Sequence, residues 1–239
     1  DFVPLIEWVE ELRLTKEQGE IDSIRRALEI AERAFEQVLG DIREGMEERE
    51  LAHILEDCMW REGAEKESFE TLVLFGARTS LPHGKPGKTA LTKGDPILMD
   101  FGCAWEGYCS DITRTLFLGD PGDEFRAAYC AVLESQNAAL QVIRSNVPCR
   151  DPDATAREVL QKHGRGDQFM HSLGHGVGLE IHEIPRLSPT EERFLLEGMV
   201  VTVEPGVYVP DWGGIRIENM VVVRSDGADL LLHRPHAVH

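Results

Sequence analysis

The chain has 239 residues, 42% of them hydrophobic, and its 43 acidic and 25 basic residues give a formal net charge of −18. This balance argues against a nucleic-acid surface, which needs clustered basic residues. The sequence contains no run of 18 apolar residues, so it does not predict a membrane span. The five cysteines form no Cys-x-x-Cys pair, which favours a reducing, cytoplasmic environment over a disulfide framework or a thiolate zinc site.

Helical patterns dominate the first part of the chain. Residues 1–14 form a short amphipathic stretch, and the capping-box pattern Thr15-Lys-Glu-Gln18 predicts that a helix starts directly after it. Apolar residues then recur at three- and four-residue steps from Ile21 to Leu39, which indicates a strong amphipathic helix. A second helix is predicted between Gly45 and Gly63, with one apolar face formed by Leu51, Leu55, Cys58 and Met59.

Strand patterns follow these helices. Thr71–Phe75 indicates a short buried strand, and the Gly-, Pro- and Lys-rich residues 82–94 predict a loop with His83 at its start. Ile97–Phe101 and Tyr108–Leu118 are predicted to be two strands joined by a turn.

The second half of the chain begins again with helices. Pro121 opens a predicted helix to about Ile143, and Pro152 opens another to about His163. Residues 164–189 contain too many glycines and turn residues to predict regular structure. Met199–Val203 and Ile215–Val223 are predicted to be a further pair of strands with a turn between them.

One arrangement of acids occurs in both halves. Asp100 ends a predicted strand and Asp111 follows eleven residues later, while Glu204 ends another and Glu218 follows fourteen residues later. Each half also begins with helices. We therefore predict two α+β halves related by a pseudo-twofold axis, an arrangement that would bring the four acids together.

These acids lie in or beside apolar, β-branched runs, where an unpaired carboxylate is costly to bury. Any one of them alone would be an ordinary turn residue, but His175, in a Leu-Gly-His-Gly stretch, adds an imidazole to the set. Four ionised carboxylates repel strongly at short range, and two divalent ions would neutralise them. We predict two divalent metal ions with Mn²⁺ as the first candidate, because oxygen ligands with one imidazole suit Mn²⁺, Fe²⁺, Co²⁺ or Zn²⁺.

Five motifs carry a resemblance to a known family. They are Ser-Asp-Ile-Thr-Arg-Thr (110–115), His-Ser-Leu-Gly-His-Gly-Val-Gly-Leu (171–179), His-Glu-Ile-Pro (182–185), Glu-Pro-Gly-Val-Tyr (204–208) and Gly-Ile-Arg-Ile-Glu (214–218). The chain resembles the pita-bread metallopeptidases over roughly residues 12–232, and it is most similar to the branch of Xaa-Pro aminopeptidases and prolidases. This resemblance implies a pita-bread α+β fold around a curved, mostly antiparallel sheet. It also implies a dinuclear-metal peptidase that hydrolyses the Xaa-Pro bond at the N-terminus of peptides or in dipeptides.

The resemblance assigns a role to each predicted ligand. Asp100 would chelate one ion, His175 and Glu204 the other, and Asp111 and Glu218 would bridge both. A hydroxide held between the ions would attack the peptide carbonyl, and Glu204 would shuttle a proton towards the leaving nitrogen.

The resemblance also implies further residues around the scissile bond. His83, His171 and His182 are the expected catalytic histidines, and His83 and His182 would also contact substrate. Alternation along a strand places Arg216 on the face of Glu218, where it either orients the substrate or pairs with a metal-bound carboxylate. The remaining histidines carry no motif and are predicted to lie on the surface: His53, His163, His233, His236 and His239.

One position departs from the family pattern, because Asn219 stands where an aspartate commonly follows the glutamate. Alternation turns residue 219 away from Glu218, so the predicted ligand set is retained.

Two other functions remain open on the sequence. A methionine aminopeptidase shares the ligand set and is normally a single domain near this length. A pita-bread binding module without catalysis, or a metal-free creatinase-like hydrolase, would lack metal ligands that are present here. The segment Glu11-Leu-Arg-Leu-Thr-Lys16 resembles the junction after the N-terminal domain of Xaa-Pro enzymes. We therefore predict that residues 1–14 are a linker remnant and that residues 15–239 form the catalytic domain.

The expected partner is a peptide or dipeptide with proline at the second position. Relatives are commonly dimers or tetramers, so a homodimer is compatible with the resemblance. The sequence leaves open the choice between aminopeptidase and dipeptidase, as well as the native metal.

Overall fold

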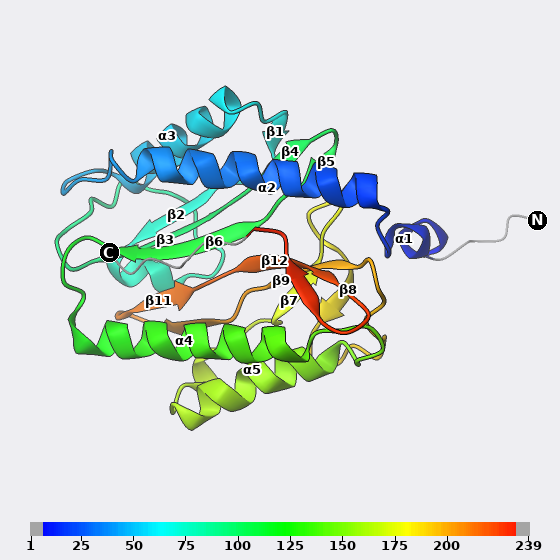
Figure 1. The fold of residues 1–239 in the computed structure, drawn as a ribbon. Helices are drawn as coiled ribbons and strands as arrows, with labels where there is room; N and C mark the ends of the chain where they lie inside the picture. The colour runs from blue at the N-terminus through cyan, green and yellow to red at the C-terminus, as the bar shows by residue number, and fades with distance from the viewer. Residues whose placement is uncertain (1–6, 233–239) are drawn as a thin grey trace, which may run out of the picture.

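The computed structural model describes residues 7–232. Figure 1 shows the strands in the middle of the molecule, with one pair of helices above them and a second pair below. The upper pair is α2 (Gln18–Val38) and α3 (Glu48–Arg61), and the lower pair is α4 (Gly122–Val142) and α5 (Arg150–Lys162). Each pair packs on its own cluster of buried apolar residues. The predicted α+β architecture of two halves is therefore confirmed.

Helix α2 buries the apolar face that its sequence predicts, but it begins later than expected. Glu17 is the N-cap residue, and its backbone N–H donates to Oε2 of Glu20 at 2.8 Å. Lys16 is held outside the helix, because its backbone N–H donates to the carbonyl oxygen of Gly198 at 2.9 Å and its ammonium group pairs with Glu183. The capping box predicted at Thr15 is therefore wrong.

The first half contributes two three-stranded sheets. One has the antiparallel order β2-β3-β6, formed by β2 (Leu72–Phe75), β3 (Pro96–Phe101) and β6 (Ile112–Phe117). The other has the order β1-β4-β5, formed by β1 (Lys66–Glu67), β4 (Cys103–Trp105) and β5 (Tyr108–Cys109). The strand expected over 108–118 is split at Ser110, whose carbonyl oxygen would lie 1.9 Å from a Cβ atom at Gly102. On either side of this close contact, β5 and β6 belong to different sheets.

The second half contributes a five-stranded sheet of order β13-β12-β9-β7-β8. Its strands are β7 (Gly174–Gly176), β8 (Glu183–Leu187), β9 (Val200–Val203), β12 (Asn219–Val223) and β13 (Ala228–Leu230). The prediction of irregular structure for residues 164–189 is wrong, because β7 and β8 lie there. The glycines of β7 reflect close packing: a Cβ atom at Gly174 would lie 2.0 Å from the carbonyl oxygen of Thr202.

A separate hairpin pairs β10 (Gly206–Val209) with β11 (Gly213–Arg216). The strand expected over 215–223 is therefore divided into β11 and β12, and β10 was not predicted. The division falls at Ile217, whose carbonyl oxygen accepts a hydrogen bond from the Gln136 side chain on α4 at 2.9 Å. This break leaves Glu218 free of strand pairing and lets its N–H donate to the carbonyl oxygen of Thr113 at 3.2 Å. The two halves are joined at this bond.

The other predicted boundaries are close to those observed. Pro121 caps α4, and Pro152 is the third residue of α5, which begins two residues earlier than expected. The loop predicted over 82–94 carries no strand or helix. Two short 3-10 helices complete the described elements, η1 (Gly76–Ser80) and η2 (Gly166–Gln168).

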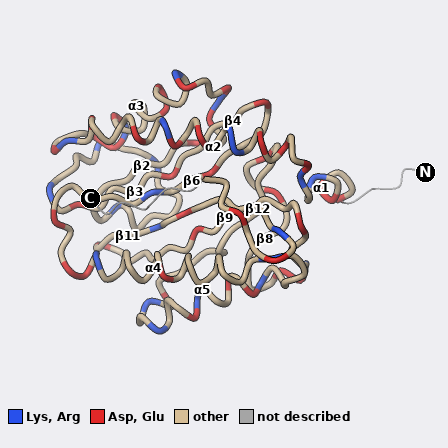
Figure 2. The backbone as a smooth tube through the Cα atoms, in the orientation of Figure 1, with Lys and Arg blue, Asp and Glu red and all other residues tan. Residues whose placement is uncertain are grey.

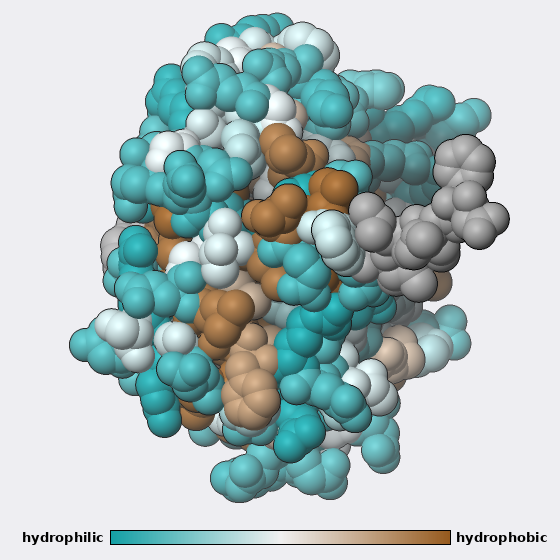
Figure 3. Space-filling model, turned by 90° about the vertical axis from the view of Figure 1, so that its right-hand side faces the viewer, coloured by the Kyte–Doolittle hydropathy of each residue, from teal (hydrophilic) through white to brown (hydrophobic). Residues whose placement is uncertain are grey.

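Helix α1 (Trp8–Arg13) projects from the body of the molecule (Figure 1). Its apolar side chains are not packed away, since Trp8 is 64% and Leu12 is 83% exposed. Figure 3 shows apolar residues gathered in the middle of the face from which α1 projects. The assignment of residues 1–14 to a linker stays a prediction, and residues 1–6 lie outside the described part of the chain.

Charged residues follow the outer helices and loops, where acidic and basic side chains are interspersed (Figure 2). His53 and His163 are exposed as predicted, whereas His233, His236 and His239 fall outside the described residues. Within residues 7–232, no helix combines the length and the apolar composition needed to cross a membrane.

Candidate metal centre and active site

A cavity of about 580 Å³ opens between the two halves. Its wall contains eight of the nine residues that the sequence singled out for metal-ligand, catalytic or substrate-binding roles: His83, Asp100, Asp111, His171, His175, His182, Glu204 and Arg216. The ninth, Glu218, is only 1% exposed and lies directly behind them. The residues that the sequence predicted from separate motifs therefore lie together in one cluster.

Three carboxylates form the centre of this cluster. Asp100 lies near the end of β3, Asp111 directly precedes β6, and Glu218 directly precedes β12. Each offers an oxygen, and these oxygens lie within 4.8 Å of one another. The Thr113 hydroxyl donates to Oε2 of Glu218 at 2.7 Å and fixes that side chain. The arrangement thus brings acids from both halves to one point, as the repeated pattern predicts.

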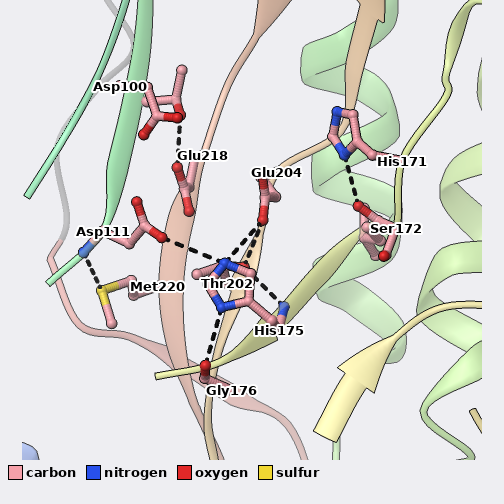
Figure 4. A network of polar contacts seen from close by, with 12 residues as sticks. Asp100, Asp111, His171, Ser172, His175, Gly176, Thr202, Glu204, Glu218 and Met220 are labelled. Carbon is pink, nitrogen blue, oxygen red and sulfur yellow. Dashed lines mark hydrogen bonds and ion pairs between the residues drawn. The ribbon is translucent and has the colours of Figure 1, made fainter. Parts of the chain in front are cut away.

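His175 connects the remaining acid to this centre (Figure 4). Its Nδ1 atom lies 3.0 Å from the carbonyl oxygen of Gly176, which can only accept, so Nδ1 carries the proton. Nε2 then directs its lone pair at Asp111 and Glu204, whose nearest oxygens both lie 3.4 Å away. A lone pair facing two carboxylates is repelled by them, and a cation placed between the three groups would remove that repulsion. The carbonyl bond on the other nitrogen is the orientation that metal-binding histidines show.

The electrostatics of the acids support the same conclusion. Burial and the charges of Asp100 and Glu204 raise the pKa of Asp111 well above its usual value, and burial together with Asp111 does the same for the pKa of Glu218. Burial also raises the pKa of Glu204, although His175 and Arg216 oppose the shift. Among the described residues, two carboxylate oxygens, Oδ1 of Asp100 and Oε1 of Glu218, are buried without a hydrogen-bond partner.

The donor set therefore fits divalent cations. Four carboxylates and one imidazole converge, two of the oxygens lack partners, and the repulsion among the acids calls for positive charge. Hard oxygen ligands with a single nitrogen exclude a soft-metal site.

Arg216 supplies a fixed positive charge at the centre. It is 3% exposed, and its Nη2 atom donates to Oδ2 of Asp100 at 2.5 Å while Nε donates to the Thr113 hydroxyl at 3.0 Å. Burial disfavours its charge, but Tyr208 and Asp100 outweigh that cost and raise the pKa of Arg216 well above its usual value. Of the two roles considered for Arg216, this geometry supports the ion pair with a carboxylate of the cluster.

Tyr208 on β10 belongs to the site although the sequence did not single it out as a site residue. Burial raises the pKa of Tyr208 to about 12, and burial with the charge of Arg216 lowers the pKa of His171 to about 4. His171 is therefore neutral, its Nδ1 donates to the carbonyl oxygen of Ser172 at 2.8 Å, and its Nε2 accepts from the Tyr208 hydroxyl at 2.9 Å. The same hydroxyl accepts from Nη1 of Arg216 at 2.8 Å. A tyrosine at the end of the Glu-Pro-Gly-Val-Tyr motif was the available signal.

We expect Tyr208→Phe to lower the free energy of unfolding by about 1–3 kcal/mol, because one N–H of the buried Arg216 loses its acceptor. Urea titration followed by circular dichroism measures this loss. Tyr129→Phe is the matched control, since Tyr129 is also buried but lies on α4. Equal losses in the two variants would show that the hydroxyl of Tyr208 has no special role.

His83 and His182 both line the cavity, from the 82–94 loop and from the residue just before β8 respectively. The ring of His182 packs edge-on against His175 with a centroid distance of 4.5 Å. Burial and the neighbouring His175 lower the pKa of His182. Both rings remain exposed to the cavity, so a substrate can reach them.

Asn219 points away from the cluster, as alternation predicts. Its Nδ2 atom donates to Oε1 of Gln136 at 3.2 Å. Gln136 in turn donates to the carbonyl oxygens of Val203 and Ile217 at 2.9 Å each. Asn219 thus contacts the residue that ties the ends of β9 and β11 to α4.

Comparison with known proteins places this site in a family context. The model of metallopeptidase family M24 matches residues 22–225. An Xaa-Pro dipeptidase of Pyrococcus furiosus is 42% identical over 97% of this chain and 66% of its own length. The solved X-Pro aminopeptidase of Thermotoga maritima has a TM-score of 0.97 and 43% identity, covering 100% of this chain and 68% of that protein. The prolidase of Pyrococcus furiosus has a TM-score of 0.95 and 42% identity over 98% of this chain and 69% of its own. The chain therefore spans about two thirds of the length of these relatives.

Proposed function

The chain belongs to metallopeptidase family M24, and from this we propose that it hydrolyses the bond between an N-terminal residue and a following proline, in peptides or in dipeptides. The observation that carries the proposal is the convergence of four carboxylates and His175 on one point, with two buried oxygens that lack partners. The names of the relatives, an Xaa-Pro dipeptidase and an X-Pro aminopeptidase, support the proline-directed substrate class.

We assign the metal ligands as Asp100, Asp111, His175, Glu204 and Glu218, holding two divalent ions of which Mn²⁺ is the first candidate. When bound, such ions acidify a water molecule and polarise the substrate carbonyl. The chain supplies the fixed geometry: Arg216 holds Asp100, Thr113 holds Glu218, and the Gly176 carbonyl orients His175.

Glu204 is the residue best suited to move a proton. Its Oε1 atom accepts from the Thr202 hydroxyl at 3.1 Å, and burial raises the pKa of its carboxyl group, which favours the uptake of a proton. It can then deliver that proton to the leaving nitrogen of proline. His171 has both ring nitrogens engaged, so its contribution is to fix Tyr208 and through it Arg216.

His83 and His182 are assigned to the substrate, because their rings face the cavity without ligating contacts to the acids. We expect His83→Ala and His182→Ala to lower kcat by about 10²- to 10⁴-fold, the usual contribution of a positioned donor or proton carrier. Metal content, measured by inductively coupled plasma mass spectrometry, should stay at the wild-type level. Loss of metal from either variant would place that histidine among the ligands instead.

The experiment that tests the function compares Ala-Pro, Ala-Pro-Ala and Met-Ala-Ser as substrates with Mn²⁺ present. Cleavage of Ala-Pro alone indicates a dipeptidase, and cleavage of Ala-Pro-Ala an aminopeptidase. Cleavage of Met-Ala-Ser alone would replace the proposal by the methionine aminopeptidase alternative. A protein that binds no metal and cleaves none of the three peptides would match the non-catalytic alternative. A homodimer and a cytoplasmic location stay predictions.

A further inference from the structure

Besides His175 on β7, three histidines line the cavity, and each of these three lies in a loop whose backbone is held by one buried acid. We propose that these acids are positioning residues: Glu48 and Glu183 set His83 and His182 against the substrate, and Asp153 sets His171 against the Tyr208 hydroxyl. The sequence patterns assigned no role to any of the three, although Glu183 lies in the His-Glu-Ile-Pro motif. The inference rests on the proposed function for its catalytic consequence, and on the contacts below for the arrangement.

Glu48 holds the loop that carries His83. It lies in the first turn of α3 and is 0% exposed. Its carboxylate accepts from the backbone N–H of Phe75 at 3.0 Å and of Gly87 at 2.8 Å, one on each side of the loop. Arg78 donates to the same carboxylate at 2.9 Å and to the Lys85 carbonyl oxygen at 2.8 Å. One side chain thus fixes both ends of the segment that places His83 in the cavity wall.

Asp153 plays the same part for His171. It lies on α5, is 0% exposed, and accepts from the backbone N–H of Leu173 at 3.0 Å. Arg157, one turn further along α5, pairs with Asp153 at 2.7 Å and donates to the carbonyl oxygens of Phe169 at 2.9 Å and of His171 at 2.5 Å. The Asp153–Arg157 pair therefore forms hydrogen bonds with the backbone on both sides of His171.

Glu183 is the neighbour of His182 and closes the connection from β7 to β8. Its carboxylate accepts from the backbone N–H of Glu180 at 3.2 Å and from Lys16 at 2.9 Å. Arg13 donates to it through both Nε and Nη2. The side chains of Lys16 and Glu183 are only 2% and 6% exposed. This connection carries His182, and it is anchored to a segment 167 residues earlier in the chain.

A common logic supports the three assignments. Each histidine lies in irregular backbone, which has no neighbouring strand to fix it, and misplacing a catalytic group by about 1 Å costs about 100-fold in rate. A buried carboxylate with charged partners keeps a fixed position, because leaving any of these groups unpaired is costly. The acids therefore fix the backbone positions of the three loops, as strand pairing or helical hydrogen bonds would do in a regular element.

A double-mutant cycle tests the inference on the Mn²⁺-loaded full chain with Ala-Pro as substrate. We expect Glu183→Gln to lower kcat about 10- to 100-fold with metal content unchanged. In a His182→Ala background the same substitution should cost less than about 3-fold, because the group that it positions is gone. In a His83→Ala background the full loss should persist. Glu48→Gln should give the reverse result, losing its effect only when His83 is absent.

Glu180→Gln is the matched control, since Glu180 lies in the same connection, also contacts Arg13, and is exposed. We expect wild-type rates from it. Equal losses from Glu183→Gln in all three backgrounds would overturn the inference, because they would indicate general damage to the fold. If Glu183→Gln does not fold, Arg13→Gln takes its place in the cycle, since Arg13 is less buried.

A second readout is independent of catalysis. Hydrogen exchange in Glu183→Gln should become faster in peptides covering residues 177–187 and remain unchanged over 76–90, and Glu48→Gln should show the opposite. An inactive wild-type protein would remove the proposed function but leave this test intact. Unchanged exchange over 177–187 would overturn the positioning role of Glu183 whatever the activity.

Discussion

Glu218→Ala is expected to abolish peptidase activity while the fold survives, and Asp111→Ala is expected to do the same. Each substitution removes one of the three carboxylates whose oxygens lie within 4.8 Å of one another, and both side chains are buried behind or in the wall of the cavity. Loss of a ligand that supports several kcal/mol of charge stabilisation corresponds to about a 10³-fold or greater fall in kcat/KM. Metal content should fall by at least one equivalent.

The fold should survive because the removed charge is a source of repulsion in the metal-free protein. Glu218→Gln should therefore melt no lower than the metal-free wild-type protein at neutral pH. Asp229→Ala is the control, since Asp229 lies on β13 and pairs with Arg224 at the surface. A Glu218→Ala or Asp111→Ala protein that works at the full rate would refute the ligand assignment.

Removal of the metal ions with a chelator is expected to abolish activity and to destabilise the protein more strongly at pH 8 than at pH 5. The pKa values of Asp111, Glu204 and Glu218 are raised in the folded protein, chiefly by burial and by one another's charges. The folded, metal-free protein therefore binds more protons than the unfolded chain above about pH 4, the usual pKa of these groups. Its free energy of unfolding must fall as the pH rises from there towards the raised values.

Bound cations reverse this trend. Their ligands must be deprotonated, so metal affinity and the stabilisation that it gives increase with pH. Differential scanning calorimetry at pH 5 and pH 8, with Mn²⁺ or with chelator, should show a gap in Tm that widens at the higher pH. Glu218→Gln should make the metal-free Tm less dependent on pH, since it removes one of the groups concerned. Parallel pH profiles for the loaded and metal-free proteins would contradict the proposed role of the acids.

The sequence predicts the parts of this site that depend on local periodicity. Alternation places Arg216 and Glu218 on one face, and both reach the cluster. The spacing of acids after predicted strands gives the repeated arrangement of the two halves. The apolar steps from Ile21 to Val38 give the buried face of α2. In each case, the direction in which a side chain points follows from the residues next to it in the sequence.

Other features depend on contacts between distant segments, and no local pattern carries them. The glycines of β7 indicate a turn when taken alone, but Gly174 is there because the Thr202 backbone passes too close for a side chain. Thr15 has the right pattern for a helix cap, yet the bond between Lys16 and Gly198 places the start of α2 later. Tyr208 gains its role only from two partners on other strands and loops.

The ion pair between Arg216 and Asp100 has a consequence for how the protein is made. These residues are 116 positions apart, so at about 5–20 residues per second the ribosome synthesises the arginine roughly 6–23 s after the aspartate. For most of that interval Asp100 and Asp111 exist in the nascent chain without Glu204, and for all of it they lack Arg216 and Glu218. On the proposed ligand assignment, the set of metal ligands is therefore complete only after the last strands of the second half have been translated.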